Sequence, residues 1–141
     1  MPVSAKVVKP LQLTTVRDLD FGTVVMGTLT ANETVSVTAA GRTCGTSGQL
    51  TCSGIFATAQ FRVVGTNNQP ILVSSASPTV TLANGSGGQL VLTPVLPTGT
   101  LTLPNSGNQG AVIQVGGRLA ITPTTPDGLY TGIIDIQVAY Q

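Results

Sequence analysis

The residues that could carry chemistry in this chain are few. The sequence contains no histidine, so neither a Ser-His-Asp arrangement nor a histidine-based metal site can be assembled. Asp18 and Asp20 form the most closely spaced pair of carboxylates, and such a pair could hold a cation or exchange protons. At the start of a strand, however, two solvated aspartates are the simpler interpretation. We therefore expect no enzymatic activity, no cofactor and no metal.

A glycine-rich run at 85–88 could suggest a phosphate-binding loop. Such a loop needs a lysine directly after its glycines and a helix behind it, and neither follows here. Asn84 and Gly85 instead form a dipeptide that is typical of a tight β-turn. The run therefore predicts a turn between two strands.

The two cysteines, Cys44 and Cys52, are the remaining reactive side chains. They flank a stretch rich in glycine, serine and threonine that is typical of a hairpin loop, so the thiols could meet across it. A disulfide there would stabilise the fold by about 2–3 kcal/mol in the chain-entropy model and would favour an oxidising compartment. The alternative is a pair of unpaired thiols that pack against their neighbours.

Charge is scarce along the whole chain. Six lysines and arginines face five acidic residues in 141 residues, which gives a net charge of +1. This balance offers no electrostatic reason to expect nucleic acid or an anionic membrane surface as a partner. No apolar run approaches the roughly 20 residues that a membrane span requires, so we expect no direct membrane insertion.

The elements that position these residues are predicted to be strands. Strong helix formers are few, and apolar residues alternate with Thr, Ser, Gly and Asn over short segments separated by turn signals. Pro10 interrupts the first patterned stretch, 3–16, and Gly116-Gly117 predicts a bulge, a kink or a tight turn. The spacing of the turns is typical of a β-sandwich in one domain.

The last segment of the chain has the most regular pattern. One register carries Tyr130, Ile134, Ile136, Val138 and Tyr140, and the other register is mostly polar or small. At about 3.3 Å per residue this predicts a strand of roughly 40 Å, well beyond the usual length. Since Gln141 follows directly in the sequence, we expect the outer edge of this strand to be uncovered.

Several short motifs occur in a recognisable order along the chain. They are DLDFGTV at 18–24 followed by Gly27, AQFRVVG at 59–65, VGGRL at 115–119, GLYTG at 128–132 and VAY at 138–140. In the order and spacing of these motifs, the sequence resembles exported bacterial surface proteins of unassigned function, related to spore coat protein U-like proteins and to subunits of chaperone-usher pili, particularly the archaic type. The resemblance extends from about Val7 to Tyr140.

The resemblance implies a specific architecture. It implies an immunoglobulin-like β-sandwich that lacks its last strand and is completed by an N-terminal donor strand from a neighbour. Residues 1–8 would form the donor segment, through Val3, Ala5 and Val7, and 9–141 would form a single pilin domain. The last strand would be one wall of the acceptor groove. Strand addition of this kind is an established recognition mode.

Two functions follow as hypotheses. The first is a structural subunit of a pilus or fimbria, a filament that polymerises by donor-strand exchange and serves cell adhesion. It would be exported through the periplasm with a periplasmic chaperone and an outer-membrane usher, and it would reside at the cell surface as an extracellular homopolymer. The second is a monomeric or coat-forming β-sandwich with a ligand- or carbohydrate-binding role. In the second case the segment 1–8 could fold back into its own domain.

Overall fold

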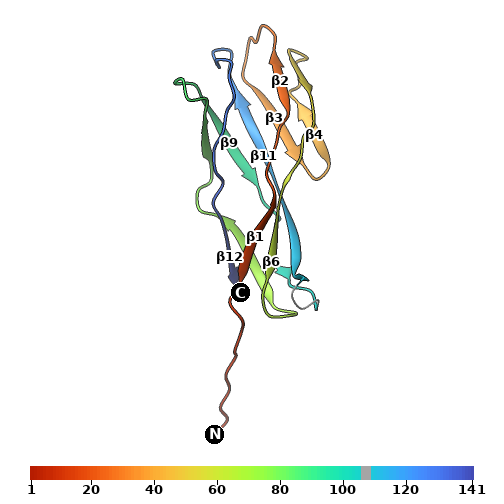
Figure 1. The fold of residues 1–141 in the computed structure, drawn as a ribbon, viewed down its shortest axis with the longest axis vertical. Coiled ribbons are helices and arrows are strands. Elements are labelled where there is room, and N and C mark those ends of the chain that lie inside the picture. The colour runs from red at the N-terminus through yellow and green to blue at the C-terminus, as the bar shows by residue number, and fades with distance from the viewer. Residues whose placement is uncertain (106–108) are drawn as a thin grey trace.

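The computed structural model describes residues 1–105 and 109–141, and its regular structure is built from antiparallel strands (Figure 1). The prediction of an all-β fold is confirmed. The strands of the described residues are β1 (Gln12–Arg17), β2 (Thr23–Met26), β3 (Glu33–Thr38), β4 (Gly41–Cys44), β5 (Leu50–Ser53), β6 (Ala59–Val64), β7 (Pro70–Ser75), β8 (Val80–Ala83), β9 (Gln89–Val95), β10 (Leu101–Thr102), β11 (Ala111–Ile121) and β12 (Ile136–Tyr140).

The strands form a curled arrangement of sheets. The largest sheet has the order β1-β6-β11-β3-β4, and β9 pairs with β11 and with β8. A second sheet has the order β10-β7-β12, and β2 and β5 form a separate ribbon. All ladders are antiparallel, and the arrangement is consistent with a β-sandwich.

Strand β11 holds the largest sheet together. Its first half, up to Val115, pairs with β6, and its second half, from Gly117, pairs with β3. The two glycines at this change of partner do not make a turn, because the strand continues through them. Their role is close packing: a Cβ on Gly116 would lie 2.3 Å from the carbonyl oxygen of Val37. Of the bulge, kink or tight turn that the sequence left open here, the tight turn is therefore wrong, and the strand changes partner instead.

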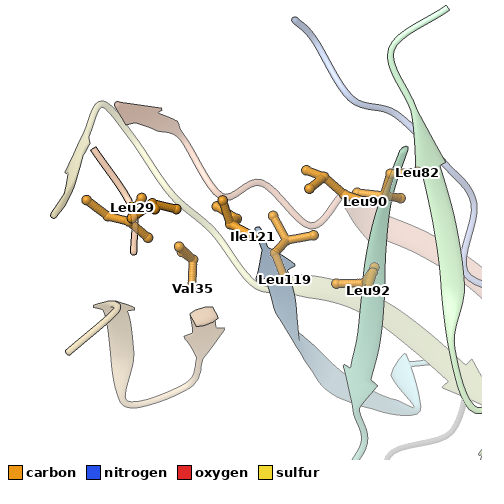
Figure 2. Packing of buried hydrophobic residues seen from close by; sticks show 8 residues of the cluster. Leu29, Val35, Leu82, Leu90, Leu92, Leu119 and Ile121 are labelled. Carbon is orange, nitrogen blue, oxygen red and sulfur yellow. The ribbon is translucent and has the colours of Figure 1, made fainter. Parts of the chain in front are cut away.

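The apolar interior divides into two clusters. Figure 2 shows the first cluster, in which leucines of β8 and β9 lie beside Leu119 and Ile121 of β11. The second cluster is built around Phe61, Val63 and Ile113 and includes residues of β7. Alternation along β3, β9 and β11 sends one register inward, as the period of two in the sequence predicts.

The last strand is shorter than its pattern predicts. Only Ile136–Tyr140 forms a ladder, with β7, while Thr131 makes an isolated bridge to Ala83 of β8. The ladder is short because the partner strand β7 ends early. Residues 76–78 form a bend between β7 and β8, so residues 130–135 have no continuous strand to join. The first patterned stretch is also shorter, since β1 begins only at Gln12 and 1–10 lie outside the sheets.

Candidate strand-docking groove

An apolar groove of about 1170 Å³ lies between two segments from opposite ends of the chain. Wall A consists of lining residues from 13–26, and wall B consists of residues 125–136. This volume exceeds the roughly 300–1,000 Å³ of small-molecule pockets, so the groove has room for an extended peptide. Its floor is formed by side chains of both core clusters: Phe61, Leu82, Leu90, Leu92, Val115, Leu119 and Ile121.

Wall B contains part of the register that the sequence singled out. Tyr130, Ile134 and Ile136 line the groove and are half-buried. Val138 and Tyr140 continue the same half-buried register but lie beyond the groove lining, where they pack against the second core cluster. The structure therefore brings three of the five predicted wall residues to the groove and places the other two at its end.

Wall A was not predicted to line a groove, although 18–24 is one of the motifs that carry the family resemblance. Leu19, Phe21 and Val24 are half-buried, line the groove and pack against the first core cluster. The alternation of Leu19 and Phe21 with Asp18 and Asp20 is a signal that could have identified this segment as a wall. What the pattern cannot give is the position of this wall opposite residues 125–136.

In the part of the chain that the structure describes, no strand lies between the groove-side edge of wall A and the groove-side edge of wall B. β1 pairs with β6, β2 with β5 and β12 with β7, and within 1–105 and 109–141 no ladder joins wall A to wall B. The peptide groups on these edges are therefore open to a further strand.

Wall B is positioned by a hydrogen bond at its start. The Tyr130 hydroxyl donates to the carbonyl oxygen of Pro126 over 2.6 Å, which fixes the turn that leads into the wall. The turn also packs on the loop between β8 and β9, where the Asn84 amide donates to the carbonyl oxygen of Asp127 over 3.3 Å. That loop is the predicted Asn-Gly turn: Asn84 Oδ1 accepts from the backbone N–H groups of Ser86 and Gly88.

Wall A is held by two arginines. The Arg17 guanidinium donates to the carbonyl oxygen and the hydroxyl of the buried Thr58, at 2.9 and 3.0 Å. The Arg42 guanidinium donates to the carbonyl oxygens of Phe21 and Ser53 and lies 4.7 Å from the centre of the Phe56 ring. These contacts fasten the middle of wall A to Thr58, which directly precedes β6, and to β4 and β5 through Arg42.

The predicted disulfide is confirmed. Cys44 and Cys52 are bonded, with their Cα atoms 6.0 Å apart. The predicted hairpin is not formed, because β4 pairs with β3 while β5 pairs with β2. The disulfide therefore joins two sheets. It ties the β2–β5 ribbon to the largest sheet, and β2 is the C-terminal part of wall A.

A buried carboxylate at the start of β3 accepts a hydrogen bond from the loop that the disulfide closes. Glu33 is 8% exposed, and its Oε2 accepts the backbone N–H of Thr46 over 3.0 Å. Hydrogen bonds from the Ser47 side chain and from the Thr46 backbone hold the pKa of Glu33 below its usual value. The ionised carboxylate thus orders the loop between β4 and β5.

The N-terminal segment, here called the arm (residues 1–8), lies outside the groove. Figure 1 shows it leaving the domain at the end where the C-terminus lies, and pointing away. Val3 and Val7 are each 90% exposed, and Ala5 is exposed as well. The root of the arm is fixed, because the Lys9 N–H donates to the Thr66 hydroxyl over 2.6 Å and the Tyr140 hydroxyl donates to the Lys9 carbonyl oxygen.

Other kinds of site were sought in the described residues. Residues 1–105 and 109–141 contain no group of three or more Cys, Asp or Glu side chains placed to hold a metal ion. Nor does this part of the chain contain a helix that is long and apolar enough to cross a membrane. Asp18 and Asp20 both lie on wall A, and Asp20 Oδ1 accepts the backbone N–H of Gly22 over 2.9 Å.

Comparison with known protein families identifies one match. The chain belongs to the family described as domain of unknown function DUF4402, whose profile covers residues 11–140. The match includes both walls of the groove and leaves out the arm. Neither a curated protein nor a solved structure is similar enough to this chain to be matched.

Proposed function

We propose that this protein is a non-enzymatic structural subunit of a bacterial surface fibre, and that the arm of one copy docks in the groove of the next. One observation carries the proposal. The same chain presents an apolar groove bordered by unpaired strand edges and, outside it, an exposed arm with alternating apolar residues. An added strand would satisfy the open edges and cover the floor of the groove.

The energy available from docking is comparable with domain stability. Burying Val3 and Val7, each 90% exposed, would contribute roughly 3–6 kcal/mol at about 1.5–3 kcal/mol per side chain. The half-buried side chains of both walls would gain further cover. Since a domain typically has a net stability of about 5–15 kcal/mol, a docked subunit would be much harder to unfold than a free one.

One contact supports an immunoglobulin-like sandwich that lacks one strand. The hydrogen bond from Tyr130 back to Pro126 has the geometry of the tyrosine corner that marks many such domains. Wall B would correspond to the strand that normally pairs with the missing last strand. The exposed edge of an incomplete sandwich is a natural site for strand addition.

The root of the arm favours docking between copies over docking within one copy. Lys9 is hydrogen-bonded to Thr66 and Tyr140, at the end of the domain where β12 finishes. From there the arm extends away from the strands of its own domain (Figure 1). To enter its own groove, the arm would have to reverse direction directly after these hydrogen bonds, whereas an arm that continues outward meets the next copy.

The remaining parts of the proposal concern assembly and location. A subunit with an open groove needs protection before it polymerises, and a periplasmic chaperone with an outer-membrane usher would supply it. The Cys44–Cys52 disulfide supports passage through an oxidising compartment. The assembled fibre would lie outside the cell as a homopolymer with a role in adhesion.

The test is a comparison of two arm variants that each introduce two asparagines, in opposite registers. Val3→Asn with Val7→Asn places amides in the groove, and Ser4→Asn with Val8→Asn places them on the solvent side. The proposal predicts that wild type forms a ladder on SDS gels without boiling, that the first variant forms none and that the second retains it. Equal assembly by both variants would refute docking through this register.

The competing function is distinguished by the same samples. A wild-type protein that stays monomeric in gel filtration and forms no ladder would remove the fibre proposal and favour a monomeric or coat-forming sandwich with a ligand-binding role. A monomer that the first variant destabilises at every protein concentration would indicate that the arm folds into its own groove.

A further inference from the structure

The few charges of this chain are divided between the arm and the groove. Four of the five acidic residues line the groove, namely Asp18, Asp20, Asp127 and Asp135. The first ten residues contain no acid and carry two of the six cations, Lys6 and Lys9. Arg17 also lines the groove, but its guanidinium is hydrogen-bonded to Thr58 on the side of β6.

The groove carboxylates are accessible. All four aspartates are exposed, and in the described part of the chain no ion pair is formed by any of them. The Asp20 carboxylate accepts one backbone N–H, from Gly22. The rim of the groove therefore carries negative charge on both walls, above an apolar floor.

The register of the arm places Lys6 at this rim. If Val3, Ala5 and Val7 point to the floor, the alternation of a strand points Lys6 outward. An outward side chain on a docked strand lies beside the outward side chains of the neighbouring strand. The Cβ atoms are about 4.5–5.5 Å apart when the residues are directly opposite and roughly 7–8 Å apart on the diagonal. A lysine spans either separation.

The direction of docking selects one carboxylate. Wall B runs from Thr125 toward Tyr140, and Tyr140 marks the end of the domain from which the arm leaves. An arm from the preceding copy therefore enters at the Thr125 end and runs antiparallel to wall B. Lys9 stays bonded to its own domain, so Val8 lies at the entrance and Lys6 lies about two residues, roughly 7 Å, inside it.

We infer that Asp127 at the entrance of the groove pairs with Lys6 of the arm of a second copy, and that the rim carboxylates steer this arm and set its register. The inference rests on the proposed fibre function and identifies a specificity device within it. An apolar strand with a period of two can slip along the groove by two residues and still fit its floor. A charge pair at the entrance distinguishes the correct register from the slipped ones.

The test measures assembly rates of the full-length chain. Lys6→Glu reverses the arm charge on an exposed residue and should leave folding of the domain unchanged. At an ionic strength of about 20 mM the variant should assemble at least about 10-fold more slowly than wild type, because opposite charges accelerate association. At about 500 mM the difference should shrink to less than about 3-fold, because salt screens the charges.

Charge exchange identifies the partner of Lys6. The double variant Lys6→Glu with Asp127→Lys should recover most of the wild-type rate at low salt, whereas Lys6→Glu with Asp135→Lys, at the far end of wall B, should recover less. Equal recovery by the two double variants would overturn the assignment to Asp127. A Lys6→Glu rate equal to wild type at low salt would overturn the whole inference.

The outcome is separable from that of the fibre proposal. If wild type assembles and the Val3→Asn, Val7→Asn variant does not, the fibre proposal stands, whatever Lys6→Glu shows. If wild type itself forms no ladder, the fibre proposal fails and the charge inference fails with it. Thermal midpoints of all variants, measured before assembly, show whether Asp127→Lys has altered the turn at the start of wall B.

Discussion

Opening the Cys44–Cys52 disulfide tests how the groove is built. The bond closes a short loop, with a sequence separation of 8, so the chain-entropy model assigns it about 2.5 kcal/mol of stability. At roughly 2.1 cal/mol/K of unfolding entropy per residue, a chain of 141 residues should lose about 8 °C in its midpoint. Because the bond joins β4 to β5 across two sheets, the loss should also loosen wall A.

The assay compares wild type and a Cys44→Ala, Cys52→Ala variant by thermal unfolding, each with and without a reductant. The wild-type midpoint should fall on reduction to near that of the variant, and the variant should not respond to the reductant, which makes it the matched control. Hydrogen exchange should rise along β2 and β5 in the reduced protein. An unchanged midpoint in fully reduced wild type, with both thiols verified by mass, would refute the reasoning.

Two further predictions concern the turn into wall B and the loop beside the disulfide. Tyr130→Phe removes the hydrogen bond to Pro126 but keeps the ring, so it should lower the free energy of unfolding by about 0.5–1.5 kcal/mol. Urea unfolding measures this change, and a urea midpoint equal to that of wild type would contradict a structural role for the bond. Glu33 has a lowered pKa in the folded state, through hydrogen bonds from Ser47 and Thr46, so its ionised form stabilises the fold above its usual pKa of 4.5. This contribution should be lost as the pH falls below 4.5 and through the folded pKa of Glu33. In the Glu33→Gln variant, the free energy of unfolding should therefore depend less steeply on pH in this range. An equally steep dependence in the variant would show that other acids cause it.

Much of the fold could be predicted from local pattern. The period of two identified the strands because alternate side chains of a strand point to opposite faces, whatever the topology. The turn at Asn84-Gly85 was also predictable, since its chemistry is local. The disulfide was predictable from the spacing of Cys44 and Cys52, but the hairpin around it was not, because β4 and β5 take their partners from β3 and β2.

Patterns failed where pairing depends on distant segments. The last strand was expected from Tyr130 onward, and its half-buried register is present over that length, but its ladder begins at Ile136 because β7 ends at Ser75. At Gly116-Gly117 the sequence indicated an irregularity, and the structure shows a change of partner within one continuous strand. In both cases the deciding atoms belong to another part of the chain.

The sequence by itself determined the all-β class, the register of wall B and the alternating arm, because these are properties of a few consecutive residues. Only the tertiary structure decided that residues 13–26 and 125–136 face each other across an open groove. It also decided that four aspartates, scattered in the sequence, share the rim of that groove. The physical reason is that a groove is a relation between chain segments from opposite ends of the sequence, and no local periodicity records which segments become neighbours.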